Sequence, residues 1–128
     1  MVDDYVVDIN ADGWREEVLD SELPVVVEFW HDRCSWCKRL APIYGELSGE
    51  YRGSLRFVRM NVLESGENTH LAIHQGVTGT PTIKFFCGCR GVGEIIGFRS
   101  KRTLREDIDK ILSIHRECLE RSTPLPSE

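Results

Sequence analysis

A pair of cysteines separated by two residues follows closely on a run of apolar residues in this 128-residue chain. The run, Val25–Trp30, is made of β-branched and aromatic residues with a single charge, Glu28, which is typical of a central strand buried on both faces. The cysteines, Cys34 and Cys37, open a segment in which apolar residues recur every three or four positions, as they do in a helix. The pair therefore stands where a buried strand passes into a helix.

The rest of the chain alternates between strand-like and helix-like segments. We expect strands near residues 5–7, 25–30 and 55–62, and helices around 14–19, 34–50 and 65–75. A hairpin of 82–86 and 94–98, joined by the glycine-rich loop 87–93, and a last helix capped by Ser100 complete the order βαβαβαββα. This order predicts an α/β fold with a central mixed sheet and helices on both faces.

The length and charge of the chain limit its class. We expect one domain over residues 1–121 and a flexible C-terminal tail over 122–128, where two prolines prevent regular structure. A net charge of −5 disfavours nonspecific nucleic-acid binding. No apolar run is long enough to cross a bilayer, and no export signal is visible. We therefore expect a cytoplasmic protein with no nucleic-acid or membrane partner, most simply a monomer.

The cysteine pair has two common uses, half of a zinc site or a redox dithiol. At the start of a helix, the partial positive charge and the unpaired N–H groups stabilise a thiolate on the first cysteine. Cys34 can then attack a substrate disulfide and form a mixed disulfide, which Cys37 resolves. Its position favours the redox interpretation.

The residues around the pair resemble the thioredoxin family. The resemblance rests on Val25–Trp30, on Cys34-Ser35-Trp36-Cys37-Lys38 with Leu40-Ala41-Pro42 after it, and on Val77-Thr78-Gly79-Thr80-Pro81-Thr82. It covers about residues 5–115 and implies a thioredoxin fold. It also implies a protein-disulfide reductase, or thioredoxin-like electron carrier in cell redox homeostasis, with no bound cofactor. The implied partners are protein disulfides and a thioredoxin reductase, either flavin- or ferredoxin-linked.

The resemblance also assigns roles to single residues. It implies that Pro81 follows a cis peptide bond and that the Thr80 backbone binds an incoming substrate chain, with Gly97 facing the active site. Trp36 lies at the rim that substrates meet.

Behind the cysteines, the resemblance implies an acid and its partners. Glu28 takes the place of a buried acid that accepts the Cys37 proton. Arg59 would be its basic partner, and Trp30 would pack under the site.

Ser35 and Trp36 depart from the Gly-Pro that thioredoxins usually place between the cysteines. The loss of proline restores an N–H at the helix start and Ser35 adds a hydroxyl, so both can stabilise the thiolate and make the protein more oxidising. An oxidising or isomerase-type protein is therefore an alternative to a reductase. A metal-binding or non-catalytic interaction module is an alternative of another class.

Cys87 and Cys89 form a second close pair, in the expected hairpin loop. Three interpretations stand: two small thiols in a turn, an accessory redox pair, or a zinc site shared with Cys34 and Cys37. The hairpin turn is expected at the end of the sheet away from Cys34, which disfavours shared zinc, and we predict no metal site. The fifth cysteine, Cys118, is expected to be a helix-face or tail thiol.

Overall fold

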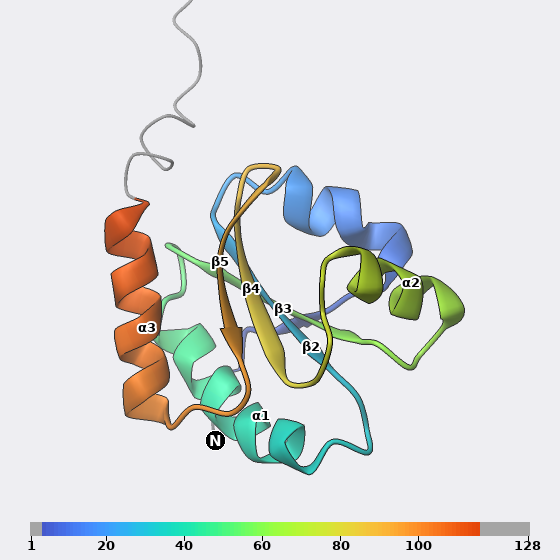
Figure 1. Cartoon of the computed structure of the whole chain (residues 1–128). Helices are drawn as coiled ribbons and strands as arrows, with labels where there is room; N and C mark the ends of the chain where they lie inside the picture. Colours follow the sequence, from blue (N-terminus) through green and yellow to red (C-terminus); the bar gives the residue numbers. More distant parts are fainter. Residues whose placement is uncertain (1–3, 116–128) are drawn as a thin grey trace, which may run out of the picture.

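A five-stranded mixed sheet forms the centre of the protein, in the order β1-β3-β2-β4-β5 (Figure 1). The computed structural model describes residues 4–115. The strands are Val7–Asp8 (β1), Val25–Trp30 (β2), Arg56–Asn61 (β3), Thr82–Cys87 (β4) and Arg90–Ile96 (β5). β3 pairs in parallel with β1 and β2, β4 runs antiparallel to β2, and β5 runs antiparallel to β4. The predicted mixed sheet is confirmed.

Helices cover both faces of this sheet (Figure 1). The elements are a 3₁₀ turn Ala11–Gly13 (η1), a π-helical turn Arg15–Leu19 (η2), and the helices Ser35–Glu50 (α1), Gly66–His74 (α2) and Lys101–Ile114 (α3). One apolar cluster joins α1 and α3 to the sheet, and a second joins η2 and α2 to the opposite face. The helix expected near 14–19 is a short π-helical turn. Val18 within it and its N-cap residue, Trp14, both face the core.

Strand alternation assigns the residues of β2 to the two faces. Val25, Val27 and Phe29 belong to the cluster under η2 and α2, whereas Val26 belongs to the cluster under α1. Because side chains alternate along a strand, Glu28 shares the α1 face with Val26.

Tyr44 fixes α1 to the sheet at this face. Its buried hydroxyl donates to the carbonyl oxygen of Val58 at 2.7 Å and lies 3.0 Å from that of Val26. One side chain therefore connects α1 to both β2 and β3, the two strands that carry Glu28 and Arg59.

The hairpin differs from the sequence prediction. β4 and β5 are longer than expected, and only Gly88 and Cys89 lie between them. The glycines suggested a loop because they weaken strands, but Gly93 lies within β5 where α3 packs closely. A Cβ atom there would come within 3.0 Å of Ile111, so the missing side chain lets α3 approach the strand.

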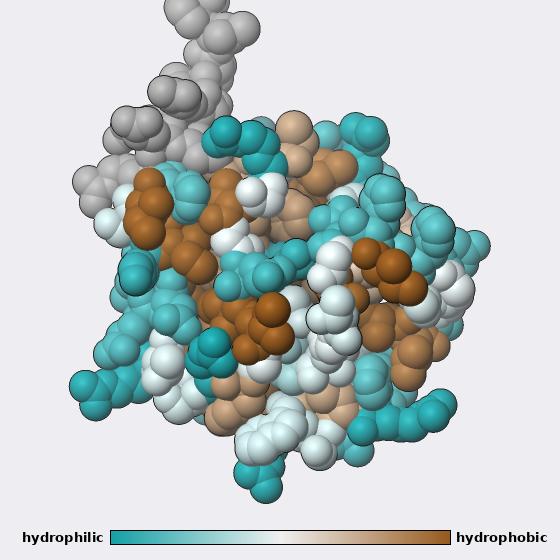
Figure 2. Space-filling view, in the orientation of Figure 1, coloured by the Kyte–Doolittle hydropathy of each residue, from teal (hydrophilic) through white to brown (hydrophobic). Residues whose placement is uncertain are grey.

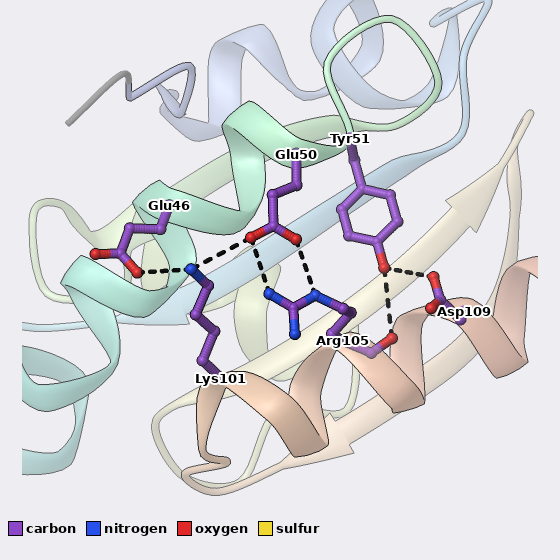
Figure 3. A network of polar contacts seen from close by, with 6 residues as sticks. All are labelled: Glu46, Glu50, Tyr51, Lys101, Arg105 and Asp109. Atoms are coloured by element: carbon purple, nitrogen blue, oxygen red, sulfur yellow. Dashed lines mark hydrogen bonds and ion pairs between the residues drawn. The ribbon is translucent and has the colours of Figure 1, made fainter.

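A network of ion pairs joins α1 to α3 (Figure 3). Lys101 lies 3.0 Å from Glu46 and 3.2 Å from Glu50, while two nitrogens of Arg105 donate to Glu50 at 2.9 Å each. The hydrogen bond from Arg105 is the main reason that the pKa of Glu50 falls to about 2. These side chains are partly exposed, so each pair contributes little to stability. Their value is positional, because they fix the start of α3 beside α1.

Residues 116–128, which include Cys118 and the predicted tail, lie outside the described part of the chain. Within residues 4–115, no helix is long and apolar enough to cross a membrane.

Candidate active site

Cys34 and Cys37 lie at the junction between β2 and α1 and form a disulfide, with Cα atoms 5.2 Å apart. Cys34 is the N-cap of α1, and its sulfur accepts a hydrogen bond from the backbone N–H of Cys37 at 3.1 Å. A thiolate at this position would accept the same hydrogen bond and would also be stabilised by the positive end of the helix dipole. Cys34 is 9% exposed and Cys37 is 3% exposed, so Cys34 is the more accessible sulfur.

Thr80, Pro81 and Gly97 lie at the same end of the sheet as the disulfide. The Thr80–Pro81 peptide bond is cis, and the following residue, Thr82, pairs with Phe29 near the end of β2. Gly97 has a positive φ of 90°, which glycine adopts readily, and its N–H donates to the carbonyl oxygen of Pro81 at 2.8 Å. The structure thus brings three predicted substrate-binding residues to the mouth of the site.

Glu28 is buried beneath α1, with 1% of its surface exposed. Burial raises its pKa to about 7, while the charge of Arg59 lowers it and that of Asp8 raises it. Its Oε1 atom is buried and has no hydrogen-bond partner among the described residues. On α1, Cys37 belongs to the buried stripe that continues through Leu40 and Tyr44. Glu28 and Cys37 therefore both face the space between β2 and α1.

Arg59 lies between two acids in one row across the sheet. Strand register pairs it with Glu28 on one side and with Asp8 on the other. Its Nε atom is 3.0 Å from Asp8, and its guanidinium carbon is 4.1 Å from the ring centroid of Trp30. Trp30 is half-buried and so holds the arginine against the sheet. Asp8 was not predicted as part of the site, because its place in this row depends on the register of β1.

Trp36 is exposed at the start of α1, with 51% of its area accessible. Its ring lies 5.2 Å from that of Phe98, and the guanidinium of Arg39 is 5.0 Å from its centroid. Ser35 is exposed beside it. Sequence reasoning missed Arg39 and Phe98. The three-residue spacing of Trp36 and Arg39 at a helix start was a usable signal, because such residues share a face.

The second cysteine pair lies at the far end of the sheet from Cys34, where Cys87 ends β4. Cys89 is exposed and its thiol is free, so it is not bonded to Cys87, which is buried. Within residues 4–115, no group of three or more cysteine, histidine or acidic side chains is arranged to hold a metal ion.

The geometry defines a class of protein. The dithiol stands at a helix start, the N–H of Cys37 is directed at the Cys34 sulfur, and Glu28 is buried beneath α1. Such a site is equipped to exchange electrons with disulfides. These are the features of a thiol-disulfide oxidoreductase.

Comparison with known proteins agrees with this class, and the chain belongs to the thioredoxin family, whose model "Thioredoxin" matches residues 5–110. It is 38% identical over 108 residues to "Thioredoxin M-type, chloroplastic" of Spinacia oleracea, covering 84% of this chain and 58% of that protein. It is 37% identical over 104 residues to "Thioredoxin" of a Synechocystis strain, covering 81% and 94%. "Thioredoxin" of Rickettsia felis is 34% identical over 102 residues, covering 80% and 94%.

Proposed function

We propose that this protein reduces disulfides in other proteins, with Cys34 as nucleophile and Cys37 as resolving thiol. The Cys34 thiolate attacks one substrate sulfur, so that a mixed disulfide forms while the substrate S–S bond breaks and its second sulfur leaves as a thiolate. Cys37 then loses its proton and attacks Cys34, which releases the first substrate sulfur and leaves the Cys34–Cys37 disulfide. The observation that carries the proposal is the N–H of Cys37 directed at the Cys34 sulfur, 3.1 Å away.

Glu28 is the proposed acceptor of the Cys37 proton. A carboxyl group with a pKa of about 7 takes up and gives up protons readily near neutral pH. Its burial on the α1 face, together with Cys37 on the facing stripe of α1, supports this role. Arg59 is its proposed basic partner and Trp30 supports that arginine through the ring contact.

Two electrons must return to the site after each turnover. We propose a thioredoxin reductase as their source, either flavin- or ferredoxin-linked, and a monomeric electron carrier acting in the reducing cytoplasm. Rates of reduction of the pure protein by a flavin-linked and by a ferredoxin-linked reductase distinguish the two donors.

The direction of electron flow is tested by the redox potential of the Cys34–Cys37 couple. A reductase is expected near the roughly −270 mV of thioredoxins, whereas about −180 mV is typical of disulfide isomerases. Equilibration with glutathione buffers, read by thiol alkylation and mass, gives the value. A potential at or above the isomerase value would favour the alternative, an oxidising or isomerase-type protein.

The Ser35-Trp36 dipeptide is expected to raise this potential. A Ser35→Gly/Trp36→Pro variant removes one N–H from the first turn of α1 and the Ser35 hydroxyl, so the Cys34 thiolate and the reduced form lose stabilisation. We expect a potential more negative by about 30 mV, which is tenfold in the equilibrium constant. Circular dichroism before and after oxidation controls for damage to the helix. An unchanged or less negative potential would show that Ser35 and Trp36 do not raise the redox potential of the Cys34–Cys37 couple.

The role of Cys87 and Cys89 as an accessory redox pair remains a prediction. A redox role requires that a Cys87→Ser/Cys89→Ser variant shifts the potential or slows turnover. Both quantities unchanged would leave the pair without a redox role, as the distance from Cys34 along the sheet suggests.

A further inference from the structure

Three exposed cationic side chains lie close to Cys34 in the sequence. Arg33, Lys38 and Arg39 are exposed and lie within five positions of Cys34, against a single acid in that stretch, Asp32. The whole chain, by contrast, has a net charge of −5. The segment that carries Cys34 is therefore basic within an acidic protein.

Seven of the 14 arginine and lysine residues among residues 4–115 lie within ion-pair distance of a carboxylate: Arg56, Arg59, Lys84, Arg99, Lys101, Arg102 and Arg105. Arg33, Lys38 and Arg39 have no such partner within residues 4–115. Their charges are thus available to an incoming molecule.

Arg39 is also held in place. Its guanidinium lies 5.0 Å from the centroid of Trp36, and that ring packs on Phe98 at 5.2 Å. An arginine on an aromatic face keeps its N–H donors free at the edge, and a carboxylate can accept from them in pairs. Ordering the side chain in advance lowers the entropy cost of binding.

An apolar surface adjoins this cation. Ile96, the last residue of β5, is 57% exposed and pairs with Thr82 next to Pro81. Figure 2 shows exposed apolar residues gathered over the C-terminal end of β5. A segment crossing the mouth therefore meets a cation and apolar side chains close to Cys34.

We propose that the site selects disulfides in acidic segments, with aspartate or glutamate beside the attacked cysteine and an apolar residue nearby. This inference rests on the proposed function and names the substrate class of the same site. Charges of opposite sign act mainly on the association rate, by factors of about 10 to 1,000 for focused clefts. The preference is accordingly one of kcat/KM, and salt weakens it because the Debye length falls from about 30 Å at 0.01 M to about 3 Å at 1 M.

The test uses three peptides that share one disulfide and one apolar neighbour and differ only in the flanking residue: Glu, Gln or Lys. Reduction of each by the reduced protein is followed at low and high salt. We expect kcat/KM to fall in the order Glu, Gln, Lys, with at least about a tenfold span at low salt and a much smaller span at 1 M salt. Equal rates for the Glu and Lys peptides at low salt would overturn the inference.

Two variants distinguish an effect of the charge beside Cys34 from an effect of the net charge of the protein. Arg39→Gln is expected to reduce the ratio of Glu to Lys rates at least threefold. Arg90→Gln makes the same charge change at an exposed residue at the hairpin end of β5 and is expected to leave the ratio unchanged. If both variants reduced the ratio of Glu to Lys rates equally, the preference could not be assigned to Arg39. The Gln peptide reports the chemistry alone, so failure to reduce it would contradict the proposed function instead.

Discussion

Replacing Cys34 with serine is expected to abolish disulfide reduction, lowering turnover by on the order of 10³ or more, as for other essential nucleophiles. A serine hydroxyl stays protonated near neutral pH and does not attack a disulfide, whereas the thiolate is the reactive form of cysteine. The insulin reduction assay with dithiothreitol measures the loss directly, because reduced insulin chains precipitate.

The matched control is Cys89→Ser. It makes the same change of sulfur to oxygen at an exposed free thiol, at the end of the sheet away from Cys34, and should keep turnover within about twofold. Equal turnover in wild type and Cys34→Ser would contradict the proposed mechanism. A loss in both variants would assign part of the chemistry to Cys89.

Replacing Glu28 with glutamine is expected to stabilise the folded protein above pH 7. The pKa of Glu28 is about 7 in the folded state against 4.5 in the unfolded chain. Between pH 4.5 and pH 7 the folded state holds a proton that the unfolded state has released. The free energy of unfolding therefore falls as pH rises through this range, and above pH 7 this contribution no longer changes. At 1.36 kcal/mol per pKa unit, the full effect is about 3 kcal/mol. Glutamine does not titrate, so the variant should escape this loss.

Urea unfolding from pH 4 to pH 8 measures the difference, which should grow through this window. Glu50→Gln is the control with the opposite sign, because its pKa is lowered to about 2. The Glu50 contribution is fully present above pH 4.5 and is lost as pH falls toward 2. From pH 4.5 to pH 8, its variant should therefore be less stable than wild type by a small amount that does not change with pH. A difference between wild type and Glu28→Gln that does not change with pH would show that Glu28 is not buried as a proton-binding group.

The same substitution tests the role of Glu28 in catalysis. If Glu28 accepts the Cys37 proton, decay of the mixed disulfide should slow in Glu28→Gln, and its rise with pH through about 7 should disappear. Single-turnover kinetics separate this step from the first attack, which the substitution should leave nearly unchanged.

Much of the site follows from the sequence because it is local. A buried strand followed by Cys34 and a helix is a continuous segment, and its periodicity is enough to predict that Cys34 stands at a helix start. The buried position of Glu28 also follows, since Val27 and Phe29 flank it within the strand.

The parts that were not predicted depend on contacts between distant segments. Asp8 reaches Arg59 only through the register of β1 on β3, and β1 has two residues. Phe98 reaches Trp36 only once β5 has crossed the sheet. The course of β5 through Gly93 was missed because glycine weakens a strand on its own, and only the approach of Ile111 explains its presence.

The reacting sulfur of Cys34 is also the cap of α1, and this links redox chemistry to helix stability. A thiolate is a stronger acceptor for the Cys37 N–H than a disulfide sulfur, so reduction strengthens the first turn of the helix. Such coupling is reciprocal. Whatever loosens the first turn destabilises the reduced form and makes the protein a stronger electron donor, and whatever tightens it does the opposite. A substrate that binds over Trp36 thereby adjusts the driving force of its own reduction.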